Sequence, residues 1–258
     1  MFGLVKFFKK CEKEGIKPIS GSILNIARSS EDRPYEFLCL AKNIDGHKNL
    51  MHGLSKASRN QSKAIAYDDF LNICNDIFVI IGSENSEIFS LILNDKEDEA
   101  VELIEKYKSD FKNNLVIEIQ NTGKESHKIF IASILPIASR LSIPVIATND
   151  VLFGDREDFE IHETKVCINS GKTLNDPNRE KIYSEEQYFK SQDEMQELFK
   201  DFPEVLSNTL EIAKQCNLSL EPDGYFLPEY PVPEGQNFDS HLKSLVEENL
   251  NNLTAKFS

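Results

Sequence analysis

The sequence Pro144-Val-Ile-Ala-Thr-Asn-Asp150-Val-Leu-Phe153 opens the most informative part of the chain. It begins with a short apolar run that contains β-branched side chains and ends in polar residues, which is typical of a buried strand. Two earlier runs, at residues 77–82 and 115–119, have the same character. Helical patterns separate or follow these runs at residues 87–93, 97–111 and 126–141. Strands that alternate with helices in this way predict βαβ units, a parallel sheet and an α/β fold.

The flanking sequence extends this pattern in both directions. Towards the N-terminus it predicts a helix over residues 2–14, a strand over 17–26, a second apolar run over 35–41 and a helix over 45–57. After Asp155 the pattern is mainly helical, with helices expected near residues 155–168, 192–201 and 203–216. Four prolines and two glycines then fall between Leu220 and Gly235, which indicates an extended linker. Residues 238–253 are expected to form an amphipathic helix.

The composition excludes several classes of protein. Charged residues make up 28% of the chain and hydrophobic residues 40%, which is ordinary for a globular protein. No apolar run approaches the roughly 18 residues of a membrane span, and the N-terminal sequence lacks the pattern of a secretory signal. The five cysteines are far apart and form no CxxC pair. We therefore expect a cytoplasmic protein with reduced, mostly buried thiols.

The charge of the chain argues against a nucleic-acid-binding surface. The net charge is −14, from 29 basic and 43 acidic side chains. Binding to DNA depends on clustered lysine and arginine side chains that neutralise phosphates. The longest basic cluster, formed by Lys6, Lys9 and Lys10, is better explained as the solvated face of a helix. We expect no direct DNA binding and no membrane contact from this chain.

A series of ordered sequence words follows residues 144–153. They are His162-Glu-Thr-Lys-Val-Cys167, Gly171-Lys-Thr-Leu-Asn-Asp-Pro177, Tyr183-Ser-Glu-Glu-Gln-Tyr188-Phe-Lys-Ser191 and Tyr225-Phe-Leu-Pro-Glu-Tyr-Pro231. Together these words resemble the N-terminal PHP (polymerase and histidinol phosphatase) domain of bacterial DNA polymerase III alpha subunits. The resemblance covers essentially the whole chain and is strongest between Ile143 and Pro233.

The resemblance implies a PHP-type distorted (β/α)7 barrel, followed by a helical annex and a Pro-rich linker. It implies a PHP-like domain over residues 1–219, a linker over 220–236 and the start of the polymerase region over 237–258. In the family, two metal-binding motifs precede the word that corresponds to Met1-Phe2-Gly3. We therefore expect the barrel to lack its first strand or strands. Unpaired backbone groups on the neighbouring strand would then make the product marginally stable and prone to associate.

Active members of the family hold two or three metal ions with side chains from many strand ends, and the metals activate water and bind phosphate. At the corresponding positions this chain has Ser22 and Ile23 in place of Cys-Glu, Ser83 in place of cysteine, and Thr122 and Leu152 in place of histidines. Asp150 matches a metal ligand, and Glu36 stands where the family has a histidine. A single clear carboxylate cannot organise a hydrolytic cluster. The resemblance therefore implies no cofactor, or at best a degenerate site for Zn, Mn or Mg.

Three further patterns have a structural explanation. Ser170-Gly-Lys-Thr173 is similar to the end of a phosphate-binding loop, but Val166 occupies the position of its first glycine. His162-Glu163 is half of a zinc-protease motif without the second histidine, and an Asp158–His162 pair on one helix face is the expected structural role. Turn and helix-cap positions, rather than paired polymerase carboxylates, are expected for Asp176, Asp193, Asp201 and Asp223.

The resemblance implies a piece of a replicative DNA-directed DNA polymerase, which is a nucleotidyltransferase of DNA replication. Because the polymerase aspartates and most metal ligands are missing, we expect this portion to be a non-catalytic structural PHP domain. The implied partners are the remainder of the polymerase III holoenzyme and its proofreading exonuclease subunit. Two alternatives remain open, namely a residual metal-dependent phosphoesterase or exonuclease and a vestigial free-standing fragment.

Overall fold

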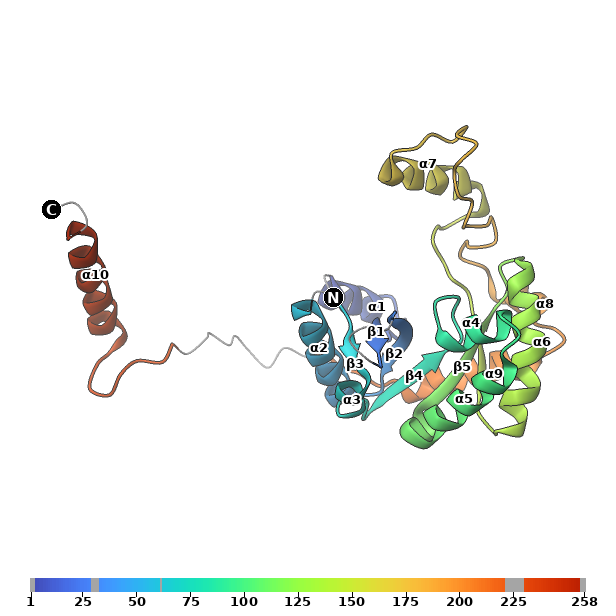
Figure 1. Ribbon diagram of the computed structural model, residues 1–258, viewed down its shortest axis with the longest axis horizontal. Helices are drawn as coiled ribbons and strands as arrows, with labels where there is room; N and C mark the ends of the chain where they lie inside the picture. The colour runs from blue at the N-terminus through green and yellow to red at the C-terminus, as the bar shows by residue number, and fades with distance from the viewer. Residues whose placement is uncertain (1–2, 29–32, 61, 221–229, 256–258) are drawn as a thin grey trace. The chain divides into compact units, whose positions relative to one another are not determined.

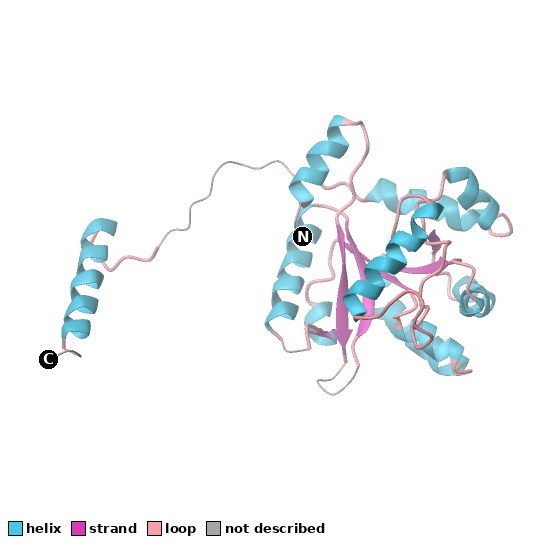
Figure 2. Cartoon of the chain, turned by 90° about the horizontal axis from the view of Figure 1, so that it is seen from above, coloured by secondary structure: helices cyan, strands magenta, loops and turns pink. Residues whose placement is uncertain are grey.

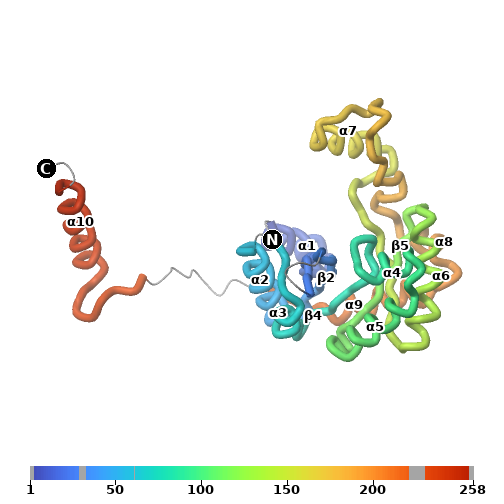
Figure 3. The backbone as a smooth tube through the Cα atoms, in the orientation of Figure 1, coloured from blue at the N-terminus to red at the C-terminus, as the bar shows by residue number. Residues whose placement is uncertain are grey.

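The computed structural model describes residues 3–28, 33–60, 62–220 and 230–255 (Figure 1). The chain divides into two compact units, Met1–Leu220 and Glu221–Ser258. The first unit contains a β-sheet with helices packed on it, and the described part of the second contains one helix, as the backbone trace shows (Figure 3). The candidate site lies entirely within the first unit.

A mixed six-stranded sheet with the order β3-β1-β2-β4-β5-β6 forms the centre of the first unit. β4, β5 and β6 are parallel, and β3 is parallel to β1, but β2 is antiparallel to both of its neighbours. The α/β fold is thus confirmed, and the predicted parallel sheet is found for β4, β5 and β6 but not around β2, because the chain between β1 and β2 is too short for a parallel crossover. The strands are β1 (Gly21–Ala27), β2 (Tyr35–Ala41), β3 (Ile65–Ala66), β4 (Ile77–Ile81), β5 (Leu115–Gln120) and β6 (Val145–Thr148).

Most helices lie within a few residues of the positions that the sequence predicts. The short elements β3 and α3, of 2 and 5 residues, have no counterpart among the predictions because so few residues carry no periodicity. The strand expected over residues 17–26 begins only at Gly21. The α-helices are α1 (Leu4–Lys13), α2 (Ile44–Arg59), α3 (Tyr67–Leu71), α4 (Glu87–Leu93), α5 (Glu97–Phe111), α6 (Glu125–Arg140), α7 (Phe159–Ser170), α8 (Gln192–Leu198), α9 (Pro203–Gln215) and α10 (Phe238–Thr254).

Both faces of the sheet are covered, which explains why every residue of β4 is buried. Alternate residues of a strand point to opposite faces. Ile77, Val79 and Ile81 belong to the large core that the sheet shares with helices such as α5 and α6, while Phe78 and Ile80 pack in a smaller core with Ile212 of α9. The cartoon shows helices around the strands (Figure 2). This arrangement is consistent with the distorted, barrel-like PHP fold.

Helix α9 covers the edge of the sheet at β6. Asn208 Nδ2 donates a hydrogen bond of 2.9 Å to the carbonyl oxygen of Val145, and Thr209 Oγ1 donates one of 3.1 Å to that of Ala147. These two carbonyl groups belong to the outermost strand of the sheet. Side chains of a helix therefore satisfy acceptors that an additional strand would otherwise pair.

The described part of the second unit is the helix α10, preceded by irregular chain. Asn237 caps α10 by accepting a hydrogen bond from the backbone N–H of Ser240 at 2.8 Å. Residues 230–236 of the expected linker form neither helix nor strand, and Pro222 and Pro228 lie outside the described residues. All five cysteines are free and buried, as predicted. In the described part of the chain, no helix is both long enough and apolar enough to cross a membrane.

Candidate functional site

A pocket of about 600 Å³ opens where β4, β5 and β6 end and the following loops begin. The carboxyl ends of parallel strands lie at one edge of a sheet, where ligands commonly bind. Four carboxylates and one lysine line the pocket, namely Glu36, Glu84, Glu118, Asp150 and Lys124. Its apolar lining consists of Ile23, Leu38, Leu152 and Ile182, with the ring of Tyr183.

The sequence positions that correspond to family metal ligands converge on this pocket. Glu36 and Asp150 both line it, together with Ser83 and Leu152, although these residues come from separate parts of the chain. Thr122 is instead buried beside His127, whose Nδ1 accepts a hydrogen bond of 3.1 Å from the backbone N–H of Thr122. The structure thus brings Glu36 and Asp150, the two predicted metal positions, to one pocket, whereas Thr122 is not among the residues that line it.

Glu118 is the central side chain that sequence reasoning missed. It lies in β5 with 2% of its surface exposed, and its Oε2 accepts a hydrogen bond of 2.7 Å from Thr148 Oγ1. Burial raises the pKa of the Glu118 carboxyl, and the nearby charges of Asp150 and Glu36 raise it further. The signal was present in the sequence as one acidic residue inside an otherwise apolar strand, Leu115-Val-Ile-Glu-Ile119.

Neutral side chains donate hydrogen bonds to two of the other three carboxylates of the pocket, Asp150 and Glu36. Gln187 Nε2 donates to Asp150 Oδ2 at 2.8 Å, and Asn85 Nδ2 donates to Glu36 Oε2 at 3.1 Å. Gln187 is itself buried, and its Oε1 accepts a hydrogen bond of 2.9 Å from the backbone N–H of Ser184. Across the described residues, no three His, Cys, Asp or Glu side chains come together as a set of metal ligands.

A compact charge cluster stands at the rim of the pocket. Both carboxylate oxygens of Glu84 lie 2.8 Å from Lys124 Nζ, and Oε1 also lies 2.7 Å from Nε2 of the buried His127. Contact with His127 and then with Lys124 lowers the pKa of Glu84 to about 2, against the opposing effect of burial. Lys124, the one basic side chain among the described lining residues, is therefore already paired.

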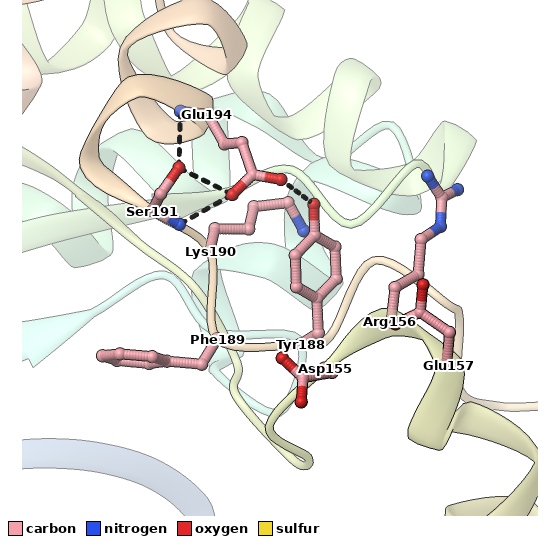
Figure 4. A pocket seen from close by; sticks show the side chains of 8 residues that line it. All are labelled: Asp155, Arg156, Glu157, Tyr188, Phe189, Lys190, Ser191 and Glu194. Carbon is pink, nitrogen blue, oxygen red and sulfur yellow. Dashed lines mark hydrogen bonds between the residues drawn. The ribbon is translucent and has the colours of Figure 1, made fainter.

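A second pocket, of about 570 Å³, lies beside the start of α8 (Figure 4). Ser191 and Glu194 form a capping box there, in which the backbone N–H of Ser191 donates to Glu194 Oε2 at 2.8 Å. Tyr188 donates its hydroxyl proton to the same carboxylate, and this hydrogen bond raises the pKa of Tyr188 to about 12. These contacts explain the polar residues of the pocket as structural elements of the helix start.

The remaining sequence motifs have structural roles. Gly171, at a φ of 68°, ends α7 in the left-handed conformation, so the Ser170–Thr173 word is a helix terminus. Glu163 pairs with Arg179, and both side chains are largely buried. His162 packs between the rings of Phe153 and Tyr183.

The expected Asp158–His162 pair is wrong for the described residues, because Asp158 Oδ2 instead accepts a hydrogen bond from the backbone N–H of Asp155. Asp176 accepts one of 2.8 Å from the backbone N–H of Asn178, as expected for a turn. Asp193 lies in the first turn of α8 and Asp201 in a turn before α9, whereas Asp223 lies outside the described residues.

Comparison with known proteins shows what the chain is similar to. Residues 1–122 match the model of the PHP domain family. The chain is also similar to the DNA polymerase III alpha subunit of Pseudomonas aeruginosa, with 39% identity over 255 residues that make up 97% of the chain and 22% of the relative. For the same subunit of Escherichia coli (strain K12), the identity is 34% over 250 residues, or 95% of the chain and 22% of the relative.

The chain thus spans about a fifth of the length of these relatives. The match to the PHP domain ends at residue 122, but Asp150, Leu152 and Gln187 complete the pocket from later in the chain. The similarity to the alpha subunits covers both portions. The pocket therefore combines side chains from the segment that matches the PHP model with side chains from the segment that follows it.

Proposed function

We propose that this chain serves as a non-catalytic, structural PHP domain of a replicative DNA polymerase III alpha subunit, acting in the cytoplasm. The observation that supports this most directly is the pairing within the pocket. Asp150 and Glu36 accept hydrogen bonds from Gln187 and Asn85, and Glu118 from Thr148. A hydrolytic metal cluster needs several converging donors that are free to coordinate. Here the acidic side chains connect strands and loops to one another.

The apolar wall of the pocket supports the same proposal. Leu152 lines it at the position where the family has a histidine ligand, and Ile23 lines it where the family has a glutamate. Neither side chain can bind a metal or transfer a proton. The domain would then act as a folded platform, with residues 237–258 as the start of the polymerase region.

Metal content and hydrolysis test this proposal together. The purified chain would be dialysed against Zn²⁺ or Mn²⁺ and its bound metal measured by mass spectrometry. It would then be assayed on a phosphodiester and on single-stranded DNA. We expect substoichiometric metal and no hydrolysis above background, with Asp150→Ala indistinguishable from the parent chain. Stoichiometric metal, together with hydrolysis that Asp150→Ala abolishes, would instead establish the residual phosphoesterase.

The proposed partners are the remainder of the polymerase III holoenzyme and its proofreading exonuclease subunit. The similarity to alpha subunits over nearly the whole chain supports membership of that assembly. Co-purification with the separately produced exonuclease subunit, and with the polymerase portion of an alpha subunit, would test it. We expect at least one stable complex in size-exclusion chromatography. Elution of this chain alone in every mixture would favour a free-standing fragment.

A further inference from the structure

The pocket at the ends of β4, β5 and β6 carries an excess of negative charge. Of its four carboxylates, only Glu84 has a cationic partner among the described residues, and that partner is Lys124. Within the described residues, Glu36, Glu118 and Asp150 accept hydrogen bonds from uncharged groups alone. Three carboxylates therefore face one cavity without a counter-ion in the described part of the chain.

Glu118 is the most deeply buried of these three carboxylates. Its side chain is 98% removed from solvent, since only 2% of the residue is exposed. Both of its hydrogen bonds, from Thr148 and the weaker one of 3.5 Å from Gln120, go to Oε2. Its Oε1 has no hydrogen-bond partner among the described residues. This oxygen belongs to a side chain that lines the pocket, so solvent or a ligand in the pocket is what can donate a hydrogen bond to it.

The walls of the pocket select the kind of cation that fits. Ile23, Leu38 and Leu152 line it together with Ile182 and Tyr183, so a ligand in the pocket contacts apolar side chains as well as the carboxylates. A small hydrated metal ion gains nothing from apolar lining residues. An aliphatic stem that ends in a charged nitrogen buries its methylene groups and presents its donors to the acidic floor. The volume of about 600 Å³ accommodates a group of this size.

We infer that this pocket binds an organic cation with an alkyl stem, an alkylammonium or alkylguanidinium group, with Glu118 and Asp150 as its principal acceptors. This inference rests on the proposed structural function, in which the cation would be the lysine or arginine side chain of a partner polypeptide. A free polyamine shares the same chemistry. Insertion of one side chain would then tie the partner to both β5 and the loop after β6.

Binding of small probes to the full 258-residue chain tests this inference. The chain would be titrated with n-butylammonium, n-butylguanidinium and uncharged n-butanol at constant ionic strength, and NMR shifts of the side-chain amides of Asn85, Gln120 and Gln187 would be followed. We expect saturable shifts with both cations and none with butanol. Glu118→Gln, and independently Asp150→Asn, should weaken binding at least tenfold. The matched control Glu105→Gln, on the exposed surface of α5, should leave it unchanged.

The outcomes separate the sources and the two proposals. Tighter binding of a lysine- or arginine-containing peptide than of putrescine or cadaverine supports a partner side chain, and the reverse order supports a free polyamine. Shifts that do not saturate, or that persist unchanged in both pocket variants, would overturn the inference. That result would leave the structural function standing, because metal-dependent hydrolysis is measured separately.

Discussion

The side-chain amide of Gln187 donates a hydrogen bond of 2.8 Å to Oδ2 of Asp150. The oxygen of the same side-chain amide accepts a hydrogen bond from the backbone N–H of Ser184. The backbone carbonyl of Gln187 accepts another, of 2.9 Å, from the backbone N–H of Leu152. A single buried residue thus connects the loop before α8 to the segment after β6. The carboxylate that the family would use for a metal holds two parts of the chain together here.

Replacing Gln187 by alanine should therefore destabilise the first unit. The change removes both side-chain hydrogen bonds and leaves the N–H of Ser184 without its partner, so we expect a loss of about 1–3 kcal/mol in the free energy of unfolding. Urea denaturation followed by circular dichroism measures it. Gln215→Ala, at an exposed position near the end of α9, is the control and should change stability little. Equal effects of the two substitutions would contradict the bridging role.

The raised pKa of Glu118 predicts a pH dependence of stability. Its carboxyl ionises near the ordinary value of 4.5 in the unfolded chain but at higher pH when folded. Above that ordinary value the folded state retains a proton that the unfolded state has released, so this group makes stability fall as pH rises. Glu118→Gln removes the effect and should gain stability relative to the parent chain between pH 5 and pH 8. Urea midpoints that differ by the same amount at both pH values would refute this.

Glu84 should act in the opposite direction on the acid side. Its folded pKa of about 2 lies below the ordinary value of 4.5, mainly because of His127. As pH falls from about 5 to 2, the unfolded chain takes up the proton first, and the stability contributed by this group is lost. Thermal melts across this range should therefore show a shallower acid-side decline for Glu84→Gln than for the parent chain. A decline of unchanged steepness would show that the rim cluster contributes nothing.

Gly82 should be intolerant of a side chain. It follows β4 at a φ of 121°, and a Cβ there would lie 2.3 Å from the carbonyl oxygen of Glu118. We expect Gly82→Ala to cost about 1–3 kcal/mol through overpacking, in addition to its backbone strain. Gly171→Ala is the control, since its φ is also positive but no atom lies within 4 Å of the added Cβ. Denaturant unfolding should rank Gly82→Ala as the more damaging change, and the reverse order would contradict the close approach of β4 and β5.

The cap on the edge of β6 can be removed with small substitutions. Asn208→Ala deletes one hydrogen bond to a strand carbonyl, and Thr209→Val deletes another with little change in shape. We expect each to cost about 1 kcal/mol and the double variant to associate at high concentration, because exposed strand edges pair with other chains. Light scattering and urea unfolding measure the two effects. Thr164→Val, on exposed α7, should change neither, and a monomeric double variant would argue against edge protection.

Local patterns predicted most elements of the fold, while the partnerships between distant residues had to come from the structure. The helices Glu87–Leu93 and Glu97–Phe111 lie where their apolar periodicity places them, and the run at Ile77–Ile81 is a buried strand. Strand direction around β2 was missed because it depends on chain connection rather than on periodicity.

For the candidate site, too, the sequence pointed to some of the residues and the structure was needed for the others. The resemblance pointed to Glu36 and Asp150 as metal positions, and the structure places both in the lining of one pocket. It gave no role to Glu118 or Gln187. The partners of these two residues are 30 and 37 positions away in sequence, and burial creates their importance.

The contact of α9 with β6 has a consequence for where this chain can be divided. Side chains of this helix donate hydrogen bonds to the outer carbonyl groups of β6. A helix in this position ends the sheet, because it offers no strand edge to which a further strand could pair. Helix α9, Pro203–Gln215, therefore completes the edge of the sheet although it is not a strand. Any shortened version that stops before this helix would expose the unpaired edge of β6. Its solubility would then depend on that edge and would say nothing about the pocket.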